Sequence, residues 1–178
     1  NGQIEWEEIY KNDKLDGKRT RWYENGQIKK EGNYKDGNEH GKKTTWYENG
    51  QIEWEGNYKD DKLDGKYTEW DENGQIKSKG NYKEGDLVNE TIYSYYENGK
   101  VESEENYKDG NLVNETKYQY YENGQIESEK NYQDDKINGK YTEWYENGQK
   151  EQEGNYKDDN LDGKRTRWYE NGQIKKEG

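Results

Sequence analysis

His40 is the only histidine in this sequence, and the sequence contains no cysteine. A single imidazole cannot form a histidine pair or a multi-histidine metal site, and without a thiol there is no thiolate chemistry. His40 also takes the place of an aspartate that recurs along the chain, so we expect an ordinary solvated side chain. The sequence therefore predicts a protein that is not an enzyme, with no catalytic residue, no cofactor and no metal.

Carboxylates are the other groups that could do chemistry. A catalytic pair needs two environments that push two pKa values apart, whereas Asp60, Asp61 and Asp64 recur in near-copies along the chain. These oxygens would suit calcium, but their spacing does not match an EF-hand loop. We expect them to form turns and to keep the surface soluble.

Composition gives two opposing indications about order. Charged residues make up 39% of the 178 residues and hydrophobic residues only 24%, which is typical of disorder. The chain nevertheless has 19 Tyr and 7 Trp, and aromatic side chains bury large areas each. Because these aromatics recur regularly, we expect an ordered protein. The formal charge of −12 disfavours binding to nucleic acid or to anionic membranes.

A repeat of 24 or 25 residues covers the chain. Asn-Gly pairs recur with this spacing, and one full copy runs from Asn49 to Glu72. We interpret residues 1–178 as one continuous array of seven full repeats and a partial one. Leu15–Gly32 and Leu161–Gly178 are identical, and the chain begins and ends within a copy, which suggests a segment of a longer array.

Each copy contains two aromatic-rich runs separated alternately by Glu-Asn-Gly and by a polar loop such as 59–65, which is the pattern of consecutive β-hairpins. The predicted fold class is all-β: a single-layer, extended antiparallel sheet of about fifteen strands. A two-residue Asn-Gly turn would place Trp70 opposite Lys77, whereas a three-residue Glu-Asn-Gly turn places it opposite Ile76. We predict the three-residue turn, with its glycine in a left-handed conformation.

This register predicts which side chains share a face. One face should carry Trp70, Thr68, Ile76, Ser78, Gly80 and Tyr82, and the other Asp71, Glu69, Tyr67, Gln75 and Lys77. Mid-strand glycines on the first face would let an aromatic ring lie over bare backbone, and a leucine row that includes Leu63 would cap it. The predicted structural aromatic row is Trp22, Trp46, Trp70, Tyr95, Tyr120, Trp144 and Trp168.

The string from Tyr23 to Asp36, followed by Leu-Asp-Gly-Lys and an aromatic pair as in Leu161–Tyr169, resembles the bacterial variant of the MORN repeat. The resemblance covers the whole chain and implies successive β-hairpins in an extended sheet. Many bacterial members carry a YwqK-type antitoxin label, and eukaryotic relatives are associated with scaffolding and membrane-lipid contact.

Charge is unevenly distributed, because the basic segments 18–30 and 164–176 flank an acidic segment at 97–135. We expect a repeat scaffold that binds a protein partner, in an extracellular or cell-envelope setting. Alternatives are an antitoxin that masks a toxin, lipid-headgroup binding through the basic segments, and self-association. The candidate interaction residues are Arg19, Arg21, Lys29, Arg165, Arg167 and Lys175.

Overall fold

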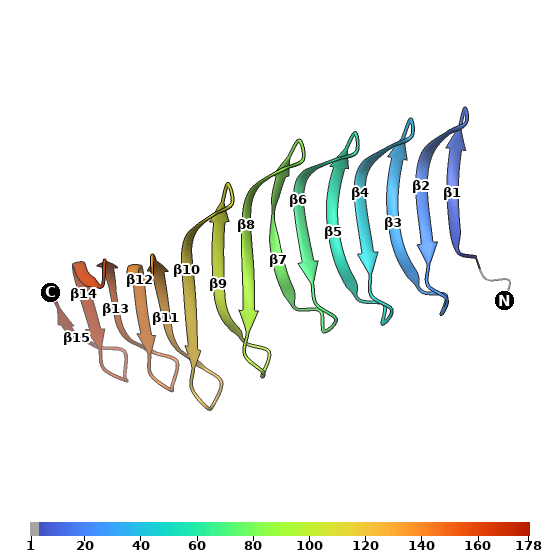
Figure 1. Ribbon diagram of the computed structural model, residues 1–178. Helices are drawn as coiled ribbons and strands as arrows, with labels where there is room; N and C mark the ends of the chain where they lie inside the picture. The colour runs from blue at the N-terminus through green and yellow to red at the C-terminus, as the bar shows by residue number, and fades with distance from the viewer. Residues whose placement is uncertain (1–3) are drawn as a thin grey trace. The chain divides into compact units, whose positions relative to one another are not determined.

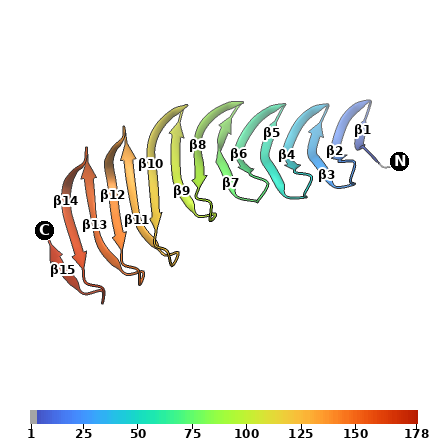
Figure 2. The same cartoon turned by 60° about the horizontal axis from the view of Figure 1, so that its bottom comes forward.

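A computed structural model describes residues 4–178 as fifteen antiparallel strands in one open sheet, with every strand hydrogen-bonded to its neighbours in sequence. Figures 1 and 2 show the strands following one another in chain order. The bounds are β1 Trp6–Lys11, β2 Lys14–Trp22, β3 Ile28–Lys35, β4 Asn38–Trp46, β5 Ile52–Lys59, β6 Lys62–Trp70, β7 Ile76–Lys83, β8 Asp86–Tyr95, β9 Val101–Lys108, β10 Asn111–Tyr120, β11 Ile126–Gln133, β12 Lys136–Trp144, β13 Lys150–Lys157, β14 Asn160–Trp168 and β15 Ile174–Glu177. The predicted fold class is confirmed.

The residues group into two compact units. Unit 1 comprises Asn1–Ile92 with Lys108–Gly110, and unit 2 comprises Tyr93–Tyr107 with Asn111–Gly178. Strands β1 to β7 therefore belong to unit 1 and β10 to β15 to unit 2.

The predicted three-residue turn is confirmed. In the turn after β6, the amide of Gly74 donates to the carbonyl of Asp71 at 3.0 Å, and the amide of Asp71 donates to the carbonyl of Gln75 at 2.8 Å. Gly74 has a φ of 83°, in the left-handed region where glycine is unstrained. Trp70 consequently lies opposite Ile76.

The polar loop at 59–65 is much shorter than the sequence indicated. Lys59 pairs with Lys62, so the turn consists of Asp60 and Asp61 alone, with φ values of 51° and 64°. Positive φ at both central residues is the geometry that matches the twist of a two-residue hairpin, and aspartate tolerates it. The expected turn-forming role of these two aspartates is confirmed, and the long loop is wrong.

A β-bulge overturns the predicted division into faces. Trp70 pairs with Ile76, but Glu69 pairs with Ser78 and Tyr67 with Gly80, so β7 has one extra residue at this point. Because strand side chains alternate, that residue moves the rest of β7 to the other face. Ser78, Gly80 and Tyr82 therefore lie with Tyr67 and Glu69, and not with Trp70, Thr68 and Ile76.

We call the two faces of the sheet by the aromatic residues that mark them. The tryptophan face of unit 1 carries Thr20, Thr44, Thr68, Trp22, Trp46, Trp70, Ile28, Ile52 and Ile76. The tyrosine face of unit 1 carries Gly32, Gly56, Gly80, Tyr34, Tyr58 and Tyr82. The same register gives unit 2 a tryptophan face with Thr142 and Trp144 and a tyrosine face with Gly154 and Tyr156.

Aromatic rings lie close over two of the four mid-strand glycines, and they do so on the tyrosine face. A Cβ on Gly56 would overlap the ring of Trp54, and one on Gly80 would overlap the backbone oxygen of Asn89 and come within 2.9 Å of Cε1 of Tyr67. The prediction fails at Gly154, where the nearest side chains are Leu161 and Arg165, and at Gly32, where the nearest atoms are 3.7 Å away. The leucine row is also on this face, because Leu63 pairs with Tyr58 inside the sheet. The prediction that the leucine row caps the tryptophan face is therefore wrong. The β-bulge, which moves the glycines to the tyrosine face, is the reason here as well.

Few residues of this sheet are fully buried. Tyr67 is the only buried hydrophobic residue among those that the structure describes. The other buried side chains are small hydroxyls, including Thr142 at 1% and Ser128 at 2% exposure. Since aromatic rings are half-buried along both faces, much of the fold must depend on backbone pairing and on contacts between neighbouring repeats.

Candidate interaction surface

On the tyrosine face of each unit, one row of side chains runs across the strands, with one residue from the equivalent position of each strand. Each member lies directly opposite the next across neighbouring strands. In unit 1 the row is Trp6, Arg21, Lys30, Thr45, Trp54, Glu69, Ser78 and Ile92. In unit 2 it is Gln119, Ser128, Glu143, Gln152, Arg167 and Lys176. We call this the variable row, because its chemistry changes from strand to strand.

The matching row on the tryptophan face is nearly constant. In unit 1 it reads Glu7, Thr20, Glu31, Thr44, Glu55, Thr68, Lys79 and Thr91, and in unit 2 Tyr118, Glu129, Thr142, Glu153, Thr166 and Glu177. Thr20, Thr44 and Thr142 are buried. In this row the tryptophan face thus carries nearly the same residues on every hairpin, whereas the residue types on the tyrosine face change from strand to strand.

Sequence reasoning found only part of the variable row. The candidate residues Arg21 and Arg167 belong to it, and Glu69 lies on the face away from Trp70, as predicted. Sequence reasoning missed Lys30, Trp54 and Ser78, because the predicted register lacked the bulge and placed these residues elsewhere. The signal that could have found them is their own variation at one position of the repeat.

The predicted basic residues of unit 1 lie on two adjacent strands. Arg19 and Arg21 are on the tyrosine face of β2, where Nε of Arg19 lies 2.7 Å from Oε1 of Glu8. Lys29 is the extra residue of the bulge in β3, and its ammonium lies 5.1 Å from the ring centre of Tyr23.

The corresponding set of unit 2 has the same arrangement. Arg165 and Arg167 are on the tyrosine face of β14, and Nε of Arg167 donates to Oε1 of Gln152 at 3.3 Å. Lys175 lies 5.3 Å from the ring centre of Tyr169. Arg167 is exposed.

An ion-pair cluster on the tyrosine face of unit 1 was not predicted. Glu39 occupies the position that is Leu or Ile in other repeats. Its carboxylate accepts from Nζ of Lys43 at 2.8 Å and from the hydroxyl of Tyr34 at 3.0 Å. Burial alone would raise the pKa of Glu39, but the hydrogen bond and charge of Lys43 lower it below its ordinary value. The replaced leucine was the available signal.

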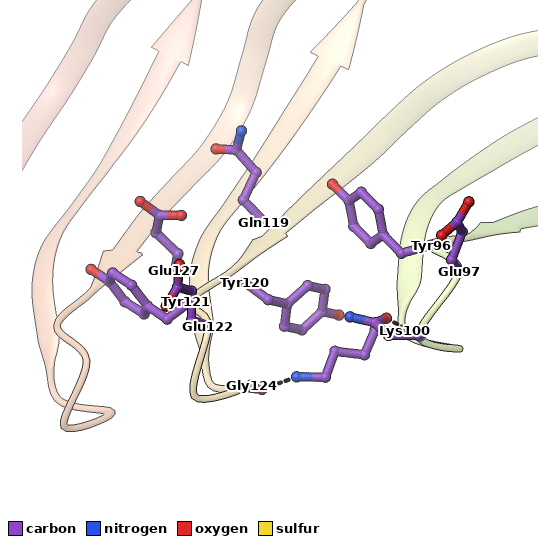
Figure 3. Close-up of a pocket in the computed structure, with 10 residues that line it drawn as sticks. Tyr96, Glu97, Lys100, Gln119, Tyr120, Tyr121, Glu122, Gly124 and Glu127 are labelled. Atoms are coloured by element: carbon purple, nitrogen blue, oxygen red, sulfur yellow. Dashed lines mark hydrogen bonds between the residues drawn. The ribbon is translucent and has the colours of Figure 1, made fainter.

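An open groove of about 880 Å³ lies in unit 2 beside two Glu-Asn-Gly turns (Figure 3). Its lining residues include Tyr96, Tyr120 and Tyr121, together with Glu122. Lys100 replaces the glutamine of other repeats, donates to the carbonyl of Gly124 and lies 4.7 Å from the ring centre of Tyr120. Because its own lysine covers the Tyr120 ring, this groove is closed to a ligand that would stack there.

The predicted aromatic row follows the tryptophan face but is half-buried throughout. Four of its residues lie opposite the expected isoleucine: Trp22, Trp46, Trp70 and Trp168. Tyr120 pairs with Ile126 and Trp144 with Lys150. Tyr95 stacks on Tyr93, with ring centres 6.5 Å apart.

The side chain of His40 is 40% exposed, and its Nδ1 lies 3.4 Å from Oδ1 of Asp60. Among residues 4–178, no group of three or more His, Cys, Asp and Glu side chains is arranged to hold a metal ion. Within the same range, the structure has no helix with the length and apolar character needed to cross a membrane.

Two solved structures share similarity with this chain. The TcdB2–TccC3–Cdc42 crystal structure is 13% identical, with 88% of this chain and 9% of that chain covered and a TM-score of 0.47. The GtfA/B complex bound to UDP and GlcNAc is 15% identical, with 61% and 21% covered and a TM-score of 0.26. This chain therefore spans a small part of either protein. The comparison with curated proteins gives no match.

The profile of the MORN repeat variant family matches seven segments of the chain. These are residues 15–36, 39–60, 63–84, 91–109, 116–134, 137–158 and 161–178. Five segments begin one residue after the start of an even-numbered strand, and the two others begin farther inside β8 and β10. Each continues through the following Glu-Asn-Gly turn, so the family unit is a strand, a turn and a strand. Hairpin register, turn chemistry and profile agree over most of the sequence, and the chain belongs to the MORN repeat variant family.

Proposed function

We propose that this chain is a non-enzymatic repeat scaffold that binds a protein partner along its tyrosine face. The observation that carries the proposal is the contrast between the two transverse rows. A Thr–Glu row with buried threonines such as Thr20, Thr44 and Thr142 repeats on the tryptophan face, whereas the variable row changes among cationic, aromatic, anionic and amide side chains. Variation on a constant frame is how repeat proteins build extended binding surfaces.

The charges of the variable row define the kind of partner. Its cationic pairs are Arg21 with Lys30 in unit 1 and Arg167 with Lys176 in unit 2. Arginine and lysine at these positions suit a partner surface with carboxylates at the matching places. The acidic segment 97–135 of a second copy offers the same chemistry, which makes self-association one outcome of the test.

The experiment compares two double charge reversals that change the net charge equally. In the first, Arg165→Glu and Arg167→Glu alter the tyrosine face of β14. In the second, Lys18→Glu and Lys164→Glu alter the opposite face, where these lysines pair with Glu31 and Glu177. A partner captured with the wild-type chain is purified and titrated against all three proteins at low and at high ionic strength.

We expect the arginine reversals to weaken binding, and the difference from wild type to shrink at high salt because exposed charges are screened there. The lysine reversals should leave affinity near the wild-type value. Equal losses from both variants, or no loss from the arginine reversals at any salt concentration, would exclude the tyrosine face as the contact surface. Sedimentation of the wild-type chain alone separates self-association from binding to another protein.

A further inference from the structure

Lys30 and Gly32 on β3 lie between arginines of one neighbouring strand and a lysine of the other. Arg21 pairs with Lys30, and Arg19 pairs with Gly32. On the other side Gly32 pairs with Lys43 of β4. All of these side chains share the tyrosine face of unit 1, so three adjacent strands bring their cationic groups together.

A comparison with the next repeat explains why a cavity exists here. Trp54 is the counterpart of Lys30, and its ring covers Gly56, the counterpart of Gly32. Lys30 has no ring to cover Gly32, and a Cβ there would meet its nearest atoms only at 3.7 Å. The result is a cavity of about 30 Å³ lined by Arg19, Arg21, Lys30, Gly32 and Tyr34. That volume admits about two oxygen-sized atoms.

The groups around the cavity carry more positive than negative charge. Arg19 pairs with Glu8 at 2.7 Å, and Arg21 lies 3.7 Å from Glu5, whose side chain is 75% exposed. Lys30 is 3.9 Å from Glu39, a carboxylate that Lys43 already engages at 2.8 Å. Four cations thus share three carboxylates, one of them largely in solvent.

This excess of positive charge changes the pKa of Lys30. Burial and the charge of Lys43 lower the pKa of Lys30 to about 8, and Arg19 acts in the same direction, while Glu39 acts against them. The neighbouring groups are Arg19 and Arg21 on β2 and Glu39 and Lys43 on β4. An anion in the cavity would relieve this repulsion.

We propose that a tetrahedral oxyanion, the phosphate or sulfate group of a ligand, binds at the mouth of the cavity with up to two of its oxygens inside, held by Arg19, Arg21 and Lys30. The terminal oxygens of such a group can each accept from a different cation, and its charge offsets the surplus. Arginine suits this role because its planar fork of N–H donors matches phosphate and sulfate geometry. The inference stands apart from the protein-binding proposal, because inorganic phosphate alone tests it.

The sequence itself offers a matched pair of variants. Lys30→Trp gives this repeat the residue that Trp54 provides one repeat further on, so it should fill the cavity and keep the fold. Lys176→Trp makes the same change in the identical segment of unit 2, where the chain that the structure describes contains no counterpart of Tyr34 or Lys43. Inorganic phosphate is titrated into the 178-residue chain that carries each change, and binding is followed by NMR of the lysine side chains.

We expect saturable binding to the wild-type chain, with the Lys30 resonance moving and its pKa rising in the presence of phosphate. Lys30→Trp should lose at least about tenfold in affinity, the equivalent of one charged hydrogen bond, and Lys176→Trp should bind as wild type. If Lys30→Trp does not fold, Arg21→Gln serves instead, with Arg167→Gln as its control and the same expectation. No saturable shift in the wild-type chain, or equal losses at the two sites, would overturn the proposal.

Sulfate and acetate at matched ionic strength identify the chemistry. Tighter binding of phosphate than sulfate assigns the site to phosphoryl groups, and the reverse order assigns it to sulfate esters. Acetate that binds as well as both would show a general charge effect and overturn the tetrahedral assignment. Affinity should also fall as pH rises through about 8, because Lys30 then loses its proton.

Discussion

The hydroxyl of Tyr23 donates a hydrogen bond to the backbone carbonyl of Trp46, one repeat further along the chain, at 2.6 Å. The same bond recurs from Tyr47 to Trp70, from Tyr121 to Trp144 and from Tyr145 to Trp168, at 2.6 to 2.9 Å. Beside it, the amide of Asn25 donates to the carbonyl of Glu48 at 3.1 Å. In these four repeats the Glu-Asn-Gly turn is thus fixed to the next repeat, which explains why Tyr and Asn accompany the glycine.

We expect Tyr47→Phe to lower the free energy of unfolding by about 1 kcal/mol, because the Trp70 carbonyl loses its side-chain partner. Tyr169→Phe is the control, since Tyr169 holds the same repeat position but is 49% exposed. Urea unfolding of both variants measures the difference. Equal losses would show that this hydroxyl does not join the repeats.

Gly74→Ala should destabilise the chain by about 1 kcal/mol, because alanine resists the left-handed conformation. A Cβ at Gly74 would also come within 3.1 Å of Oε1 of Gln51. Glu72→Ala, in the same turn but exposed, is expected to have little effect. Thermal unfolding compares them, and identical midpoints would contradict the turn assignment.

The sequence was sufficient for the turn after each tryptophan, because only one turn length places Trp70 opposite Ile76. It was not sufficient for the faces. No residue type in β7 identifies the bulge in the sequence. The bulge can be recognised only from the strand pairing, in which Ser78 lies opposite Glu69. A shift of one residue moves all later side chains of the strand to the other face.

The ion-pair cluster around Glu39 could not be predicted from the sequence for a related reason. A polar loop as long as the predicted one would include Glu39, yet Glu39 pairs with Tyr34 inside the sheet because the turn before it, Asp36-Gly37, has only two residues. Turn length depends on whether two residues accept positive φ, and composition alone does not fix that. The cationic neighbours of Glu39 could therefore not be placed beside it.

Two glycines at the same repeat position should respond differently to alanine. Neither has a positive φ, so only the space above them matters. In Gly56→Ala the new methyl group would displace the Trp54 ring, at a cost of about 1–3 kcal/mol. In Gly32→Ala the methyl group would meet Cγ of Lys43 at an ordinary 3.7 Å, and stability should be kept. Denaturant unfolding and tryptophan fluorescence report both effects, and similar losses at the two sites would refute the ring placement.

The stability of the fold should fall as pH rises above about 10. Burial raises the pKa of Tyr67, Tyr118 and Tyr141 above 10.0, with further increases from nearby glutamates. In the unfolded chain tyrosine loses its proton near pH 10, whereas the folded chain holds these three protons to higher pH. The folded state then binds more protons than the unfolded state, so the stabilisation is complete below about pH 10 and is lost above it.

Lys30 contributes with the opposite sign between pH 8 and its ordinary pKa of 10.5, because there the unfolded chain binds the extra proton. Unfolding free energies from about pH 9 to pH 11, with tyrosinate absorbance recorded in parallel, separate the two effects. Tyr67→Phe should flatten the decline above pH 10, since it removes one of the protons that the fold retains. A decline that is equally steep in wild type and Tyr67→Phe would mean that the Tyr67 hydroxyl titrates alike in the folded and unfolded chain, contrary to its burial beside Glu90 and Ser78.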